Sequence, residues 1–174
     1  MITKNIVVVP WQPEWLRSFE KIRDTLLPEL KGLILTIEHV GSTSVPGLAA
    51  KPIIDIDIVI EDQQAFPAVK EALARLGYQH VGDLGIRGRE AFKYSNKLEL
   101  MEHHLYVCVQ GSSELKRHLA LREHLKAHPE DRDRYARVKY AAAARHPTDI
   151  DAYLEEKTPI ILEIYQKSGL NTTA

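Results

Sequence analysis

The stretch from Ile53 to Ile60 reads Ile-Ile-Asp-Ile-Asp-Ile-Val-Ile and is the strongest strand signal in the 174-residue chain. Six of its eight residues are isoleucine or valine, which strands favour, whereas aspartate is disfavoured in strands. Side chains two residues apart project to the same face of a strand. We therefore expect the isoleucines at positions 54, 56, 58 and 60 to be buried against helices, and Asp55 and Asp57 to share the opposite face.

Two carboxylates held a few ångströms apart repel each other, and a divalent cation between them removes that penalty. Mg²⁺ is usually held by one or two carboxylates together with substrate phosphates. The pattern predicts that Asp55 and Asp57 are catalytic and bind Mg²⁺ or Mn²⁺. A strand with a solvated acidic face is the simpler alternative for such a triplet.

A loop rich in glycine, serine and proline, residues 41–52, precedes this strand. Glycine allows a backbone to approach a phosphate closely, and successive N–H groups in a turn form an anion site. We expect the phosphate-binding residues to be Gly41, Ser42, Thr43, Ser44 and Lys51. A serine- and threonine-rich turn or helix cap is the commoner explanation of the loop alone.

The two pieces together are more specific, because Gly41-Ser42 is followed after twelve residues by Asp55-Ile56-Asp57. This spacing resembles the signature of the DNA polymerase beta-like nucleotidyltransferase superfamily. The segments 39–48 and 51–55, the turn at 85–89 and His103-His104-Leu105 resemble the GrpB family within it. The resemblance extends into the C-terminal helices and covers most of the chain.

The resemblance implies an α+β fold with a nucleotidyltransferase-type mixed β-sheet backed by helices, followed by a helical lobe. We expect the core to span residues 1–110 and the helical extension 111–174. Helices are predicted at 13–30, 66–76, 113–127, 130–145 and 151–167. Strands are predicted at 34–40, 53–60 and 103–109, with two more inside 78–95 and a short edge strand or extended arm at 6–9.

The superfamily pattern usually has a third carboxylate on a later strand, and the predicted strand 103–109 contains no acid. His104 is the nearest polar replacement, and Glu102 is a second candidate. A neutral imidazole can bind a transition metal but is a poor Mg²⁺ ligand. Polymerase-like chemistry is therefore less strongly predicted than the fold.

Tyr135 and Lys139 share a spacing with Tyr153 and Lys157, so each pair lies on one helix face. A packed tyrosine beside a solvated lysine is the simpler reading. By resemblance to nucleotidyltransferases with a helical second lobe, we expect the lysines to close over a nucleotide triphosphate. The expected nucleotide-binding residues are Arg122, Lys139 and Lys157, with Arg117 as a competitor.

Two further patterns have simpler explanations. His124 and His128 have a zinc-compatible spacing on a predicted helix, but no third ligand accompanies them. Asp149-Ile150-Asp151 repeats the aspartate spacing, but it precedes a helix-forming run, so Thr148 or Asp149 is expected to be an N-cap.

The formal net charge of −1 provides no basic field for non-specific nucleic-acid binding, so nucleic acid is not an expected partner. The single cysteine, Cys108, precludes an internal disulfide, and no apolar run approaches the ~18 residues of a membrane span. The apolar run before Pro10 is too short for a signal peptide. We expect a cytoplasmic location.

Three functions are compatible with these features. The first is a metal-dependent nucleotidyltransferase that moves a nucleoside monophosphate from a nucleoside triphosphate to an acceptor. The second is a nucleotide-binding or regulatory module with weak or no catalysis, which the missing third carboxylate favours. The third, an interaction domain with a relict site, is disfavoured by the joint presence of Gly41, Ser42, Asp55 and Asp57.

Overall fold

The computed structural model describes residues 4–172. Its helices are α1 (Glu14–Leu30), α2 (Phe66–Arg75), α3 (Ser113–Ala127), α4 (Pro129–Arg145) and α5 (Ile150–Lys167). Its strands are β1 (Thr36–Val40), β2 (Ile54–Ile60), β3 (Gln79–Gly82), β4 (Arg89–Lys93) and β5 (His103–Val109). Two short 3-10 turns, η1 (Ser42–Ser44) and η2 (Gln63–Ala65), complete the elements. No helix in this part of the chain is long and apolar enough to cross a membrane.

The five strands form one mixed sheet in the order β1-β2-β5-β4-β3. The β2 strand lies between β1, with which it pairs antiparallel, and β5, with which it pairs parallel. The outer pairs β4–β5 and β3–β4 are antiparallel. The expected α+β class and mixed sheet are therefore confirmed.

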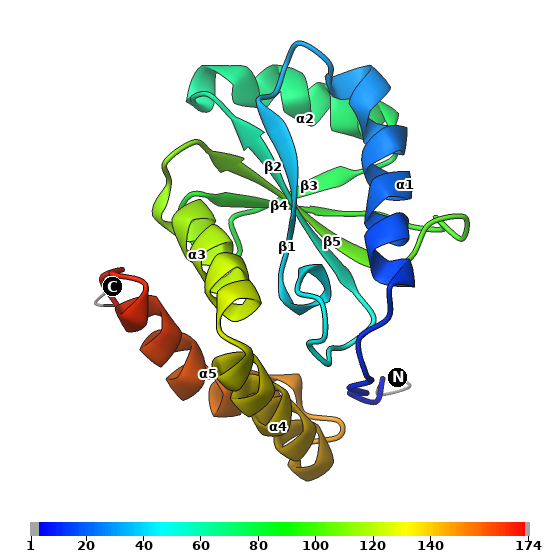
Figure 1. The fold of residues 1–174 in the computed structure, drawn as a ribbon. Helices are drawn as coiled ribbons and strands as arrows, with labels where there is room; N and C mark the ends of the chain where they lie inside the picture. Colours follow the sequence, from blue (N-terminus) through cyan, green and yellow to red (C-terminus); the bar gives the residue numbers. More distant parts are fainter. Residues whose placement is uncertain (1–3, 173–174) are drawn as a thin grey trace.

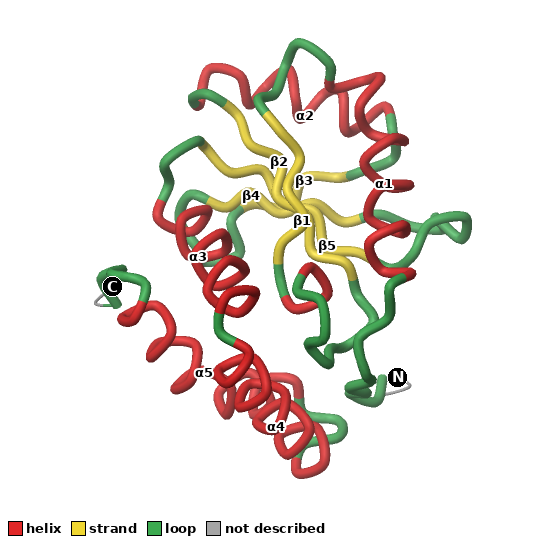
Figure 2. The backbone as a smooth tube through the Cα atoms, viewed as in Figure 1, coloured by secondary structure: helices red, strands yellow, loops and turns green. Residues whose placement is uncertain are grey.

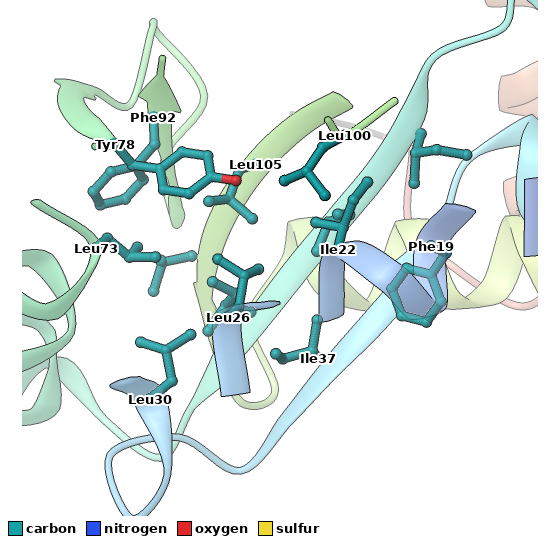
Figure 3. Close-up of a cluster of buried hydrophobic side chains, with 14 of the residues drawn as sticks. Phe19, Ile22, Leu26, Leu30, Ile37, Leu73, Tyr78, Phe92, Leu100 and Leu105 are labelled. Carbon is teal, nitrogen blue, oxygen red and sulfur yellow. The ribbon is translucent and has the colours of Figure 1, made fainter. Parts of the chain in front are cut away.

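One face of the sheet packs under α1 and α2. The isoleucines of β2 at positions 54, 56, 58 and 60 are all at most 1% exposed on this face, as the alternation predicts. Figure 3 shows Phe19, Ile22, Leu26 and Leu30 of α1 grouped with side chains from α2 and the strands. At roughly 25 cal/mol per Å² of apolar surface, this burial is the main favourable contribution to folding.

The other face of the sheet meets α3, through a small cluster of Val59, Cys108 and Leu115. The helices α4 and α5 form a lobe beyond α3, on the side away from α1 and α2 (Figures 1 and 2). A third apolar cluster joins this lobe to the loop after β1, because Val45 and Leu48 pack against residues of α3, α4 and α5. Side chains of the loop after β1 thus bridge the expected boundary near residue 110.

The ends of the elements differ slightly from expectation. The strand β1 begins at Thr36, two residues late, because Leu33 N–H donates to the Leu30 carbonyl and completes the helix end. Residues 6–9 form an arm with a single bridge between Val9 and Ala50. Asp149 caps α5 by accepting from Ala152 N–H, as expected. Ser112 stands at the N-cap of α3, but its hydroxyl makes no cap hydrogen bond.

The cluster that bridges core and lobe predicts that the chain unfolds as one unit. Ile164 is 0% exposed in this cluster, so Ile164→Ala should lower the free energy of unfolding by about 2–5 kcal/mol. Urea unfolding should be followed by far-ultraviolet circular dichroism and by fluorescence of Trp11 and Trp15, which lie outside the lobe.

Both signals should shift together in Ile164→Ala. The matched control is Leu162→Ala on the same helix, where the side chain is 37% exposed and the change should stay within about 0.5 kcal/mol. A variant whose fluorescence transition stays at the wild-type midpoint while the circular dichroism transition splits would show that the lobe unfolds independently.

Candidate functional site

The polar face of β2 carries two aspartates in different environments. Asp55 pairs in register with His104 of β5, and Asp57 pairs with Tyr106. The Asp55 side chain is 33% exposed, whereas the Asp57 side chain is 0% exposed. The two carboxylates share one face, as predicted, but only Asp55 is open to solvent.

Asp55 is held between His104 and the turn that follows β1. The His104 Nδ1 lies 3.0 Å from Asp55 Oδ1. Because an ionised carboxylate can only accept, Nδ1 is the donor in this hydrogen bond and Nε2 is the nitrogen that Asp55 leaves unused. On the other side, Gly41 has φ of 72°, and a Cβ there would collide with the Asp55 carboxylate. Gly41 is therefore required both by its backbone conformation and by the close approach of Asp55.

Asp57 has a partner that the sequence reading missed. His118 of α3 lies with Nδ1 2.6 Å from Asp57 Oδ2, and its Nε2 lies 3.2 Å from Glu114 Oε1. Burial disfavours the imidazolium, but the hydrogen bonds to Asp57 and Glu114 outweigh it and raise the pKa of His118 to about 9. Each of the two carboxylates therefore has its own histidine partner, which the sequence did not predict for Asp57.

The turn at Gly41–Ser44 uses part of its polar groups internally. Ser44 Oγ donates to the Gly41 carbonyl, and Thr43 Oγ1 lies 2.9 Å from His39 Nε2. Burial lowers the pKa of His39 to about 4, so this ring is neutral at physiological pH. Ser42 and Thr43 line the neighbouring pocket, whereas Ser44 does not. The Ser42 hydroxyl lies against the Tyr135 phenol.

A pocket of about 410 Å³ opens between the sheet and the helical lobe. It is lined by Ser42, Thr43, Ala50, Lys51, Ile53, Asp55, Ile86, Arg89, His104, Tyr106, Lys139, Ile150, Tyr153, Leu154 and Lys157. Asp55 is the sole acid in this lining. The core contributes the aspartate and the Ser42 turn, and the lobe contributes two lysines, so the pocket lies between the two regions.

Three lysines of this lining have no ion pair or hydrogen bond within residues 4–172. Lys139 is 1% exposed and its Nζ is buried without a polar partner in that range. The ammonium groups lie over aromatic rings instead, with Lys139 Nζ 4.6 Å from the Tyr135 ring centre and Lys157 Nζ 4.7 Å from that of Tyr153. Lys51 Nζ is 5.3 Å from the Tyr153 ring centre. Such contacts offset only part of the cost of burying a charge.

The same burial perturbs the protonation of the lysines. Desolvation lowers the pKa of Lys157 to about 8, and the nearby Asp55 opposes this shift. Desolvation and then repulsion from Lys157 lower the pKa of both Lys139 and Lys51. A cluster of lysines with depressed pKa values beside a single carboxylate makes this pocket a candidate anion site.

Several expected site residues lie elsewhere. Arg122 donates to Glu38 and to the His39 carbonyl, so it braces α3 against β1 outside the pocket. Arg117 lies near Glu114, and Glu102 pairs with Lys4. Arg89, which the sequence reading did not single out, enters the pocket with its guanidinium 4.3 Å from the Tyr106 ring centre.

The histidine pair on α3 also has a structural explanation. The rings of His124 and His128 stack with centroids 4.0 Å apart, and His124 Nε2 lies 2.7 Å from Asp131 Oδ2. Within residues 4–172, no three of the histidine, cysteine, aspartate and glutamate side chains are grouped to hold a metal ion. Asp55 is the one carboxylate in the lining of the pocket.

A family model described as GrpB protein matches residues 5–167. The chain belongs to the GrpB family. The UPF0157 protein BH1888 of Halalkalibacterium halodurans is 35% identical over 95% of this chain and 83% of its own length. The UPF0157 protein YqkA of Bacillus subtilis is 35% identical over 88% of this chain, which spans 44% of YqkA.

The crystal structure of GrpB from Enterococcus faecalis superimposes with a TM-score of 0.79 at 34% identity, covering 92% of this chain and 98% of that one. The poly(U) polymerase Cid1, solved with MgGTP, superimposes with a TM-score of 0.56 at 14% identity, covering 78% of this chain and 44% of Cid1. The second likeness concerns the fold alone and supports a nucleotidyltransferase-like α+β fold for this GrpB chain.

The desolvated lysines of the pocket predict a gain in stability when one of them is replaced. Lys157→Met should raise the free energy of unfolding at pH 7 by roughly 1–3 kcal/mol, because each unit of pKa depression costs about 1.4 kcal/mol. Below pH 8 the ammonium is charged in both states and the cost is full. As pH rises from about 8 toward the unfolded pKa near 10.5, the unfolded chain binds more protons and wild-type stability recovers.

The measurement is the difference in urea-derived unfolding free energy between Lys157→Met and wild type at pH 7 and pH 9.5. Taking this difference cancels the pH-dependent contributions of groups that both proteins share, including His118. It should shrink at the higher pH. The exposed Lys70→Met on α2 is the control and should show no difference at either pH. If Lys157→Met is less stable than the wild type at pH 7, the cost assigned to desolvation of the Lys157 ammonium is contradicted.

Proposed function

We propose that the pocket binds a nucleoside triphosphate and that the GrpB chain transfers its nucleoside monophosphate to an acceptor. The observation that carries this proposal is the group of three lysines that line the pocket with the Ser42 turn, namely Lys51, Lys139 and Lys157. Lys139 is buried, Lys51 and Lys157 are partly buried, and Asp55 is the sole acid that lines the pocket with them. A triphosphate supplies several negative charges at one place. Lysine binds phosphate as a point charge, and an incoming anion would relieve the repulsion between these ammonium groups.

The phosphates would lie against the turn and the lysines, and the rest of the nucleotide would extend across the lining. The phosphate-binding residues of the proposal are Gly41, Ser42, Thr43, Lys51, Lys139 and Lys157. Arg89 and Tyr106 form an aromatic and cationic surface at the sheet, where a base or ribose could contact them. Ser44 and Arg122 are left out because their polar groups are already used elsewhere.

In the reaction, an acceptor hydroxyl attacks the α-phosphorus, a new phosphorus–oxygen bond forms and pyrophosphate leaves. The proton of the hydroxyl passes to His104 Nε2, because Nδ1 is already committed to Asp55. The Asp55 carboxylate fixes the orientation of the ring and stabilises the imidazolium that forms, as an aspartate does in other acid–base pairs. This arrangement gives His104 a catalytic role in place of the metal-ligand role expected from its position on the strand.

The residues present fit one Mg²⁺ or Mn²⁺ ion held by Asp55 and the triphosphate oxygens. Such an ion would neutralise charge on the phosphates and pyrophosphate. Cid1 shares the fold and was solved with MgGTP, which supports the choice of ligand class. The proposal places the catalytic carboxylate at Asp55, while Asp57 stays behind the pocket wall with His118.

A nucleotide-binding module without transfer activity is the second candidate. The observation that favours it is that the Asp57 side chain is 0% exposed and paired with His118. A site with two accessible carboxylates would be better equipped for metal-assisted transfer. The lysine cluster serves both candidates equally. Binding and transfer are therefore tested separately.

Binding should be visible as thermal stabilisation. With ATP, GTP, CTP or UTP and Mg²⁺ at 100 times the dissociation constant, the triphosphate should add about 2.7 kcal/mol to stability. Lys139→Gln and Lys157→Gln should abolish the shift in melting temperature without lowering the melting temperature of the free protein. Lys97→Gln is the control, because Lys97 lies over the Tyr78 ring outside the pocket and should leave the shift unchanged. Equal shifts in all three variants would refute the site.

Transfer should depend on the Asp55–His104 pair. With α-labelled triphosphate and a metabolite extract as the source of acceptor, Asp55→Asn and His104→Gln should each lower product formation by about 10²- to 10⁴-fold. The thermal shift with nucleotide should persist in both variants. Asp24→Asn on α1 is the remote control. Nucleotide binding with no labelled product in the wild type would leave the binding module as the function.

A further inference from the structure

We infer that His118 is the built-in counter-charge of Asp57, so that the GrpB site holds one divalent ion, at Asp55, instead of two. This inference rests on the proposed function for the ion at Asp55. It goes beyond it by assigning to His118 a positioning role and to the site a metal stoichiometry.

The contacts of His118 favour the charged form of its ring. Its two ring nitrogens lie 2.6 Å from Asp57 Oδ2 and 3.2 Å from Glu114 Oε1. A neutral imidazole carries one N–H and has an acceptor on its other nitrogen, whereas an ionised carboxylate can only accept. Two carboxylate partners therefore require a proton on both nitrogens. The ring between Asp57 and Glu114 is an imidazolium, and it already supplies the positive charge that a cation would bring.

Asp57 is also closed to an incoming ion. Its side chain is 0% exposed, and Oδ1 has no hydrogen-bond partner within residues 4–172. A bound Mg²⁺ keeps several waters and needs oxygen ligands in near-octahedral array. Two-metal sites place both ions about 3.5–4 Å apart in one shared space. Asp55 lines the pocket and Asp57 does not, so the two carboxylates do not face a common space.

The neighbours of Asp57 leave His118 as its cationic partner. On β1 the residue opposite Asp57 is Glu38, whose carboxylate is bound by Arg122. On β5 the residue opposite is Tyr106, which carries Arg89 on its ring. Both arginines are thus directed to other groups, and His118 makes the one ion pair of Asp57 within the described chain.

The experiment counts bound Mn²⁺ by electron paramagnetic resonance, with a non-hydrolysable ATP analogue and without it. The wild type with analogue should bind one Mn²⁺ per chain, and His118→Ala should bind one more. The matched control, Glu114→Gln on the same helix, leaves His118 against Asp57 and should keep the wild-type count. Two ions in the wild type, or no additional ion in His118→Ala, would overturn the inference.

The experiment separates a failure of the proposed nucleotide function from a failure of the role of His118. If the analogue does not bind but His118→Ala still gains an ion, the proposed function is wrong and the role of His118 stands. If the analogue binds but His118→Ala binds no additional Mn²⁺, the role assigned to His118 is wrong and the proposed nucleotide binding stands.

A second measurement covers the case in which His118→Ala does not fold. Asp57→Asn should lower the melting temperature, because it leaves the buried imidazolium with Glu114 alone. The double variant Asp57→Asn with His118→Gln should recover part of that loss, since both buried charges are removed. Losses that simply add in the double variant would show that His118 does not compensate Asp57.

Discussion

The parallel pairing of β2 with β5 fixes the rest of the GrpB site. In this register Asp55 faces His104 and Asp57 faces Tyr106, while the alternate residues of both strands enter the apolar core. A slip of one residue would turn the isoleucines of β2 toward the pocket and the aspartates into the core. Packing of the whole apolar face under α1 and α2 therefore holds the register. The same register fixes the positions of the polar side chains on the opposite face.

The pocket concentrates charge in a way that a purely structural surface would avoid. Lys139 is nearly inaccessible and has no polar partner for its ammonium in residues 4–172. Burying such a group costs stability unless a counter-charge is present. The cost is offset by the core on the other side of the sheet. Strain of this kind is typical of sites where stability is exchanged for binding.

Much of this could be read from the sequence. The period-two pattern of residues 53–60 predicts both the strand and its buried face, and the Gly41-Ser42 spacing places the turn next to Asp55. The shared spacing of Tyr135-Lys139 and Tyr153-Lys157 predicts that each pair lies on one helix face, and in the structure each ammonium lies over the ring of its tyrosine. The simpler reading of a solvated lysine is wrong for Lys139, which is buried. These features are local, or follow from one strand and its neighbours.

What the sequence did not predict depends on how α3 docks on the sheet. Only Leu115 and Leu125 of α3 are buried, so the helix has no broad apolar stripe to reveal its inner face. As a result, His118 was not assigned to Asp57, and Arg122 was assigned to the nucleotide instead of Glu38. The spacing of Glu114 and His118 was the available signal, since residues four apart share a helix face.

The lobe and the core make one site because the same short loop serves both. The turn from Gly41 to Ser44 approaches Asp55, and the residues that follow at once, Val45 and Leu48, are buried in the cluster of the lobe. Packing of this cluster holds Lys139 of α4 and Lys157 of α5 in the same pocket as the Ser42 turn. Anything that loosens the lobe would withdraw Lys139 and Lys157 while leaving Asp55 in place. The affinity for an anion should therefore depend on the docking of the lobe more than on the integrity of the sheet.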